Sequence, residues 1–281
     1  MRKLVLLFTT LFVVGVIAAC GSNDGASTET EGEADEAAAT EETYEIKVGV
    51  TAGPHEQVME KVKEVASENG LEIELVVFTD YVMPNIALDE GEIDANSFQH
   101  GPYLEDFKTE RDLDLTAVAN TINFPMGIYS SQVDSIDEIE DGDKLGLPND
   151  PTNAAHALFI FEEAGLITLK EDAGHTASIK DITDNPLNLE FVELEAAQIP
   201  MHLDEVAAAA INTNYAIENE YTPAEDAIYL ESNESPWVDL IAVRTEDKDS
   251  PAIQKLVESY HSDEVKEFVE TEFPGSLIPT W

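Results

Sequence analysis

Cysteine is almost absent from this chain of 281 residues, because Cys20 is the only one. An intramolecular disulfide is therefore excluded. Basic residues are also scarce: 14 Lys and Arg stand against 59 Asp and Glu, which gives a formal net charge of −45. This charge disfavours nucleic acid and anionic lipid headgroups as general electrostatic partners. It is typical of a protein surface that stays soluble in high salt or in alkaline medium.

The usual motifs of catalysis and nucleotide binding are missing as well. The chain has no GxxxxGK[ST] loop, no GxGxxG after a strand, no HExxH and no GxSxG. No two histidines stand at the spacing of metal ligands on a helix; they are His55, His100, His156, His175, His202 and His261. The sequence therefore offers no argument for an enzyme, a metal site or a cofactor.

The N-terminus has the composition of a secretory signal. Arg2 and Lys3 precede the apolar run Leu4–Ile17, which is short for a membrane span. The run ends in Ile-Ala-Ala-Cys at Cys20, which resembles a bacterial lipobox. The resemblance implies that residues 1–19 are removed and that Cys20 carries lipid on its sulfur and on its new amino terminus. Several acyl chains would anchor the protein firmly. The alternative is an ordinary signal peptide followed by an incidental cysteine.

An acidic segment follows the cysteine. Residues 24–43 carry eight acids, and no basic residue stands between Lys3 and Lys47. Such a segment cannot bury a core, and its charges repel one another. We therefore expect residues 20–43 to be a disordered tether, and the folded part to be held at the extracytoplasmic face of the cell membrane.

Patterns of strands and helices alternate through the rest of the chain. The chain is long enough for two domains, and 43% of its residues are hydrophobic. The alternation indicates an α/β architecture with mostly parallel sheets. The expected strands are 44–50, 71–78, 93–97, 115–122, 127–130, 144–148, 189–194, 206–212, 227–230 and 238–244. The expected helices are 55–70, 82–90, 101–109, 151–164, 196–203, 251–260 and 263–271.

One of these helices begins with clear local signals and contains an unexpected side chain. In PNDPTNAAHAL (148–158), Asp150 can cap the helix and Pro151 suits its first position. His156 follows on a segment that is otherwise rich in small and apolar residues.

A series of longer motifs identifies the chain with a family. They are VGVTAGPH (48–55), FTDYVMPNIALDEGEIDANSFQHGPYL (78–104), FPMGIYS (124–130), LPNDPTN (147–153), ELEAAQIP (193–200), AAINTNYA (209–216), ESPW (234–237) and VRTEDKDSP (243–251). In this order they resemble the methionine-binding lipoprotein family, the NlpA-type substrate-binding lipoproteins of methionine ABC importers. The resemblance runs from about residue 44 to residue 281.

The resemblance implies a two-lobed, periplasmic-binding-protein-like fold, in which each lobe is a mixed sheet flanked by helices. Residues 44–124 plus 220–281 would form lobe 1, and residues 125–219 would form lobe 2. The chain would cross between lobes near residues 123–126 and 212–222. The ligand would lie in the interlobe cleft, where polar groups converge. Closure of the lobes would be read by an ABC permease and its ATPase.

The resemblance also implies ligand-binding residues. Tyr81, Phe98, His100 and Tyr103 match positions that cradle the ligand's side chain, and aromatic faces suit a thioether. Without the resemblance, Phe98 and Tyr103 could equally be core residues, and His100 a structural histidine. Asn214 matches a position that meets the ligand's head group. Its alternative role is a helix cap, which Asn212 fits at least as well.

Two positions depart from the family's pattern. His156 stands where the family has an arginine that holds the ligand's carboxylate, and Asp239 stands where it has an asparagine near the same group. An imidazole is charged only when protonated, whereas a guanidinium is always charged. Both changes disfavour a free α-carboxylate and favour a cationic group. Alternatively, His156 and Asp239 pair with each other or with neighbours, and methionine binding persists in weaker form.

We therefore predict a lipid-anchored receptor of an ABC importer that binds methionine or a related amino-acid-like ligand without covalent chemistry or a cofactor. Within this class, a more cationic ligand or a short peptide stays open. Outside it stand a surface adhesin or structural lipoprotein, and an enzyme that uses His100 with Asp239 or His156 as an acid–base pair.

Overall fold

Six strands form the first sheet, in the order β13-β4-β12-β3-β1-β2. The computed structural model describes residues 43–232 and 235–281. Strand β1 runs parallel to β2 and β3, whereas β12 is antiparallel to β3 and β4, and β13 is antiparallel to β4. The strands are β1 (Tyr44–Thr51), β2 (Leu71–Phe78), β3 (Ala95–His100), β4 (Leu115–Asn123), β12 (Val238–Arg244) and β13 (Ile278–Pro279). The predicted signal peptide, Cys20 and the tether lie outside the described residues, apart from Thr43.

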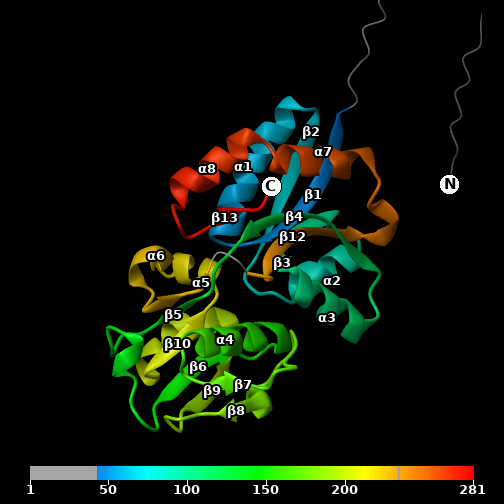
Figure 1. Ribbon diagram of the computed structural model, residues 1–281. Coiled ribbons are helices and arrows are strands. Elements are labelled where there is room, and N and C mark those ends of the chain that lie inside the picture. Colours follow the sequence, from blue (N-terminus) through cyan, green and yellow to red (C-terminus); the bar gives the residue numbers. More distant parts are fainter. Residues whose placement is uncertain (1–42, 233–234) are drawn as a thin grey trace, which may run out of the picture. The chain divides into compact units, whose positions relative to one another are not determined.

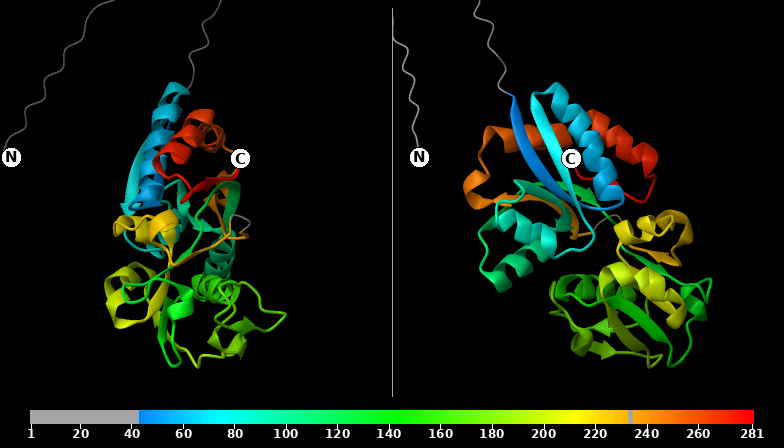
Figure 2. Two further views of the ribbon diagram at one scale, coloured as in Figure 1. Left: turned by 60° about the vertical axis from the view of Figure 1, so that its left-hand side comes forward. Right: turned by 180° about the vertical axis from the view of Figure 1, so that it is seen from behind.

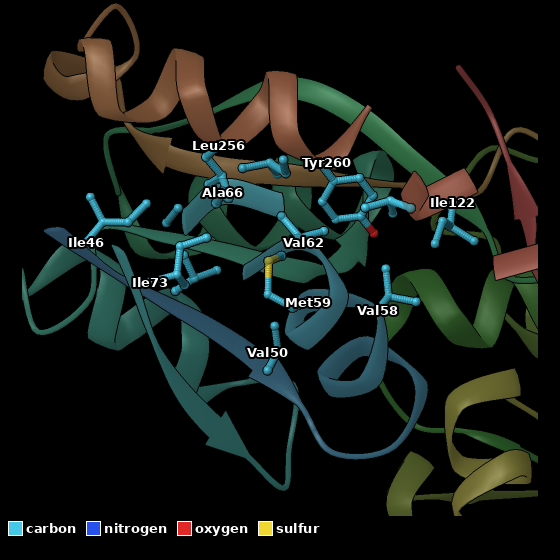
Figure 3. Close-up of a cluster of buried hydrophobic side chains, with 14 of the residues drawn as sticks. Ile46, Val50, Val58, Met59, Val62, Ala66, Ile73, Ile122, Leu256 and Tyr260 are labelled. Atoms are coloured by element: carbon cyan, nitrogen blue, oxygen red, sulfur yellow. The ribbon is translucent and has the colours of Figure 1, made fainter. Parts of the chain in front are cut away.

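Helices cover both faces of this sheet (Figures 1 and 2). Helices α1 (Pro54–Glu68), α7 (Pro251–Tyr260) and α8 (Asp263–Glu272) contact one another and the sheet, and α2 (Met83–Asp89) and α3 (Gly101–Arg111) pack against β3 and β12. Helix α1 buries Val58, Met59, Val62 and Ala66, which recur every three or four residues (Figure 3). This stripe packs on strand residues that include Val50 and forms the first core.

Five strands form the second sheet, in the order β11-β5-β10-β6-β9. They are β5 (Gly127–Tyr129), β6 (Lys144–Pro148), β9 (Glu190–Leu194), β10 (Ala208–Ile211) and β11 (Tyr229–Leu230). Strand β6 is parallel to β9 and β10, whereas β5 is antiparallel to β10 and β11. Helix α4 (Pro151–Glu163) and the 3₁₀ helix η3 (Ala196–Glu205) both pack against β6 and β10.

The residues of β10 contribute alternately to two hydrophobic clusters, one on each face of the second sheet. Ala208 and Ala210 belong to the cluster that contains the α4 side chains, whereas Ala209 and Ile211 belong to the cluster that contains the η3 side chains. Because successive side chains of a strand point to opposite faces, a strand buried on both faces is apolar throughout. The run Ala208–Ile211 meets that requirement, since all four of its residues are buried.

Several details correct the sequence-based expectations. Each sheet is mixed, as the family resemblance implied, and not mostly parallel, as the alternation of strands and helices indicated. Residues 196–203 lie in a 3₁₀ helix, not an α-helix, and Pro200 lies inside it, where it cannot donate a backbone hydrogen bond. The short strands β7 (Thr168–Leu169) and β8 (Ile182–Asp184) and the short helices α5 (Thr213–Glu218) and α6 (Pro223–Asp226) were not expected.

The strand pairings show where the chain passes between the two sheets. The chain passes from β4 in the first sheet to β5 in the second between Asn123 and Gly127. Strand β11 pairs with β5, so the chain returns to the first sheet between Leu230 and Val238. The expected return near residues 212–222, and with it a first lobe that resumes at residue 220, is therefore wrong for the strand pairing.

The architecture confirms the predicted fold class, mixed sheets flanked by helices. Helix α7 has the expected limits, and α4 begins as predicted, with Asp150 as its cap and Pro151 in its first turn. Among the described residues, no helix has both the length and the apolar character that crossing a bilayer requires.

Candidate ligand-binding site

A cavity lies between residues that the two sheets position. Its lining residues come from the ends of strands, the starts of helices and the segments that connect them. They are His55, Tyr81, Phe98, Gln99, His100, Tyr103, Phe124, Asn153, His156, Asn212, Thr213, Asn214, Trp237 and Asp239.

Aromatic side chains form one wall of the cavity. The ring centroids of Tyr81, Phe98 and Tyr103 lie 5.9–6.2 Å from one another. The Tyr103 hydroxyl donates to the carbonyl of Tyr81 at 2.9 Å, which ties the loop after β2 to α3. Burial raises the pKa of Tyr81 well above its usual value, so this phenol stays protonated. The wall therefore presents neutral aromatic surface to the cavity.

His100 ends β3 and caps α3. Its Nδ1 accepts the N–H of Tyr103 at 3.1 Å, and its Nε2 lies 3.3 Å from Asn153 Oδ1. Because an amide oxygen only accepts, Nε2 carries the proton. Burial, together with the nearby His156, lowers the pKa of His100 to about 3. The imidazole is neutral, and it links the first sheet to α4 in the second.

Asn153 connects several of these groups at the start of α4. Its Nδ2 donates to Asp150, and its Oδ1 also accepts from Asn212 Nδ2 at 2.7 Å. Asn212 occupies the N-cap position of α5, but its side chain makes no cap bond. On α5, Asn214 Oδ1 accepts from the Tyr81 hydroxyl at 2.6 Å, a second link between the sheets. Two amide atoms of the cavity, Asn212 Oδ1 and Asn214 Nδ2, have no hydrogen-bond partner among the described residues.

His55 and Asp239 form one buried acid–imidazole pair. Gly53, at φ 79°, precedes α1 in a conformation that favours glycine, and this turn places His55 in the first turn of the helix. His55 Nε2 lies 2.9 Å from Asp239 Oδ2, and its Nδ1 lies 2.7 Å from Thr51 Oγ1. Burial raises the pKa of Asp239, and the hydrogen bond from His55 partly offsets that rise.

His156 and Glu231 form a second such pair. His156 Nε2 lies 3.0 Å from Glu231 Oε1, and the two side chains are 3% and 6% exposed. The contact does not meet hydrogen-bond geometry, and it becomes an ion pair only when the imidazole of His156 is protonated. Glu231 Oε2 accepts the backbone N–H of Met126 at 3.0 Å. The His156 ring also stacks on Trp237, with centroids 4.5 Å apart.

The structure brings together every ligand-binding residue predicted from the sequence. All seven line this one cavity: Tyr81, Phe98, His100, Tyr103, His156, Asn214 and Asp239. The two departures from the family's pattern do not pair with each other. Asp239 pairs with His55, and His156 pairs with Glu231.

Sequence reasoning missed three residues that shape the site. His55 and Asn153 stand within motifs that signalled the resemblance, VGVTAGPH and LPNDPTN, and their positions there were the available signal. Glu231 had no such signal, because its partner His156 is far away in the sequence. Across the described residues, no three His, Cys, Asp or Glu side chains are arranged to hold a metal ion.

Comparison with known proteins gives one consistent result. The sequence model of the NlpA lipoprotein family matches residues 46–281. The chain is 46% identical over 239 residues to the D-methionine-binding lipoprotein MetQ of Escherichia coli (strain K12), which covers 84% of this chain and 88% of that protein.

Solved structures agree with the sequence match. A nutrient-binding protein from Burkholderia cenocepacia bound to methionine has a TM-score of 0.82 and 45% identity, and the match covers 84% of this chain and all 100% of that one. A periplasmic substrate-binding protein of an ABC transporter from Coxiella burnetii has a TM-score of 0.81 and 40% identity, with coverage of 84% and 100%.

Proposed function

Because this chain belongs to the NlpA lipoprotein family, we propose that it is a lipid-anchored, extracytoplasmic substrate-binding protein of an ABC importer. It binds methionine or a related small amino-acid-like ligand and delivers it to a membrane permease that is driven by an ATPase. The relatives named as a D-methionine-binding lipoprotein and as a periplasmic substrate-binding protein support this proposal. No covalent chemistry is part of it.

The observation that carries the proposal is the composition of the cavity. One wall is aromatic, and the rest of the lining includes amides, imidazoles and a carboxylate. Such a division suits a ligand with an apolar tail and a polar head. A methionine-like thioether would contact Tyr81, Phe98 and Tyr103, since sulfur interacts favourably with aromatic rings.

The head group would be held by residues of both sheets. Asn214 Nδ2 is available as a donor and Asn212 Oδ1 as an acceptor, and His156 and Asp239 lie in the same lining. His100 contributes only its ring surface, because both of its nitrogens bond to the protein.

The two sheets, with their helices, would act as two lobes that close on the ligand. Two observations support this role: the chain crosses between the sheets twice, and the bonds Tyr81–Asn214 and His100–Asn153 join the sheets at the cavity. Closure would bury the ligand and create the surface that the permease reads. Lipid on Cys20 would hold the receptor at the membrane.

Ligand binding tests this proposal directly. Native mass spectrometry of protein purified without refolding should show a bound amino-acid-like molecule. In a thermal-shift panel, one small molecule at about 100 times its Kd should add about 2.7 kcal/mol to the free energy of unfolding. The variant Asn214→Ala should lose that shift, whereas Asn120→Ala, at an exposed position of β4, should keep it. If no amino-acid-like compound shifts the protein, an adhesin or structural lipoprotein becomes the better assignment.

A further inference from the structure

Among the described residues that line the cavity there is no lysine or arginine. The described basic side chains lie elsewhere, and Arg244, for example, pairs with Asp94 and Asp247 outside the site. The lining contains one carboxylate, Asp239, and a second, Glu231, lies directly behind His156. Asp150, which is half-buried, accepts from the side chain of Asn153 at 3.0 Å. The head-group region thus has acids but no permanent cation.

The imidazoles around the cavity do not outweigh the negative charge of these acids. With both protonated, the pairs His55–Asp239 and His156–Glu231 are each neutral, and with either imidazole neutral the total is negative. The third imidazole, His100, stays uncharged because burial lowers its pKa to about 3. Asp150 adds either nothing or a further negative charge. With the carboxylates of Asp239 and Glu231 ionised, the net charge of the two pairs is therefore zero or negative, whether the imidazoles are protonated or not.

This charge distribution disfavours the carboxylate of an amino acid and favours its ammonium group. An ionised carboxylate would leave water for a buried site that offers neutral donors but no uncompensated positive charge, which is costly. An ammonium group would meet the carboxylate of Asp239 and the available oxygen of Asn212. The aromatic ring of Trp237, which also lines the cavity, favours a cation as well.

We propose that the cavity selects a cationic ligand, a methionine-like thioether that carries an ammonium group and no ionised carboxylate. This inference rests on the proposed receptor function and specifies the charge of its ligand.

A series of three thioethers with one common tail tests the inference. L-methionine is a zwitterion, 3-(methylthio)propylamine keeps only the ammonium group, and 4-(methylthio)butanoate keeps only the carboxylate. Isothermal titration calorimetry at about pH 7.5, where the amine is charged and the carboxylic acid ionised, compares them. The amine should bind at least about tenfold more tightly than methionine, a difference of about 1.4 kcal/mol. The carboxylate compound should not bind measurably.

Two variants show whether the acid–imidazole pair sets this preference. His156→Arg places a permanent cation at the cavity, and Glu231→Gln removes the acid behind it. Each should shift the ratio of methionine to amine affinity toward methionine by at least about tenfold. The controls are His202→Arg and Glu205→Gln, because His202 and Glu205 form an exposed pair with the same 3.0 Å separation. They change the total charge equally and should leave the ratio unchanged.

The outcomes separate this inference from the receptor function. Methionine binding as tightly as the amine, or more tightly, would overturn the cationic assignment and leave the receptor function intact. A ratio that moves equally in the control variants would also overturn it, because the preference would then come from total charge. If none of the three thioethers binds, the methionine-related function itself fails. Circular dichroism and a thermal melt establish that each variant is folded, and one folded cavity variant is enough for the comparison.

Discussion

The imidazole of His100 has both of its nitrogens in hydrogen bonds within the protein. This arrangement requires the neutral ring, and it agrees with the lowering of its pKa from 6.5 to about 3. In the unfolded chain the same ring takes up a proton at its ordinary pKa. Acid therefore favours the unfolded state, and the contribution of His100 to stability falls as the pH drops below about 6.5.

His100→Asn tests this dependence, because asparagine can still cap α3. Between about pH 7.5 and pH 5, the wild-type protein should lose about 2 kcal/mol more of its unfolding free energy than the variant does. Urea unfolding at the two pH values measures the difference. His202→Asn, at a partly exposed pair, is the control and should follow the wild type. Parallel losses in wild type and His100→Asn would contradict the neutral, buried assignment.

At the scale of elements, the first turn of α4 both stabilises the helix and positions side chains of the cavity. Asp150 accepts the N–H of Asn153 at 2.9 Å and the Asn153 side chain at 3.0 and 3.1 Å. Asp150 thereby fixes the side chain of Asn153, and the Oδ1 atom of Asn153 accepts hydrogen bonds from Asn212 and His100. A helix cap thus also orients three polar residues of the cavity.

Asp150→Ala should therefore affect both stability and binding. Loss of the cap should cost about 1–2 kcal/mol of unfolding free energy, and ligand affinity should fall severalfold because Asn153 is released. Asp150→Ser should restore most of the stability. The matched control is Ser262→Ala, which removes the cap of α8 outside the cavity lining. It should cost similar stability at unchanged affinity, and unchanged affinity in Asp150→Ala would contradict the positioning role.

At the scale of the whole chain, the excess of acids is the dominant electrostatic feature. With 59 Asp and Glu against 14 Lys and Arg, most carboxylates have no cation to pair with. Helix α8 is an example, because Glu264, Glu267 and Glu270 are all exposed on ten residues that contain a single lysine. Repulsion of this kind destabilises the folded state at low ionic strength, and salt screens it.

Salt should therefore stabilise the protein. Raising NaCl from about 0.05 to about 1 M should increase the unfolding free energy by about 1 kcal/mol or more, because the screening length falls from more than 10 Å to about 3 Å. Urea unfolding at the two concentrations measures the increase. A variant with Glu264, Glu267 and Glu270 all changed to Gln should gain less from salt. An equal gain in both proteins would show that the effect does not come from these charges.

Local signals and family motifs predicted different parts of this structure. Local chemistry was sufficient for the start of α4, because Asp150 and Pro151 act within one turn. The family motifs predicted seven residues that all line one cavity, and the roles of these residues toward a ligand stay a prediction. The role of Glu231 was not predicted, because its contact with His156 depends on tertiary structure alone. A strand was predicted at residues 227–230, but the return point of the chain was not predicted, because it depends on the pairing of β11 with β5, which the residues of the strand do not reveal.

Trp237 gives the cavity a built-in optical reporter. Its indole stacks on His156 and meets the edges of His100 and His175 at centroid distances of 5.1 and 4.9 Å. The only other tryptophan of the chain, Trp281, stacks on His261 and lies outside the cavity lining. Replacing Trp281 with phenylalanine would leave a single emitting indole in the wall of the site. Fluorescence from that indole would then follow occupancy of the cavity without any attached label.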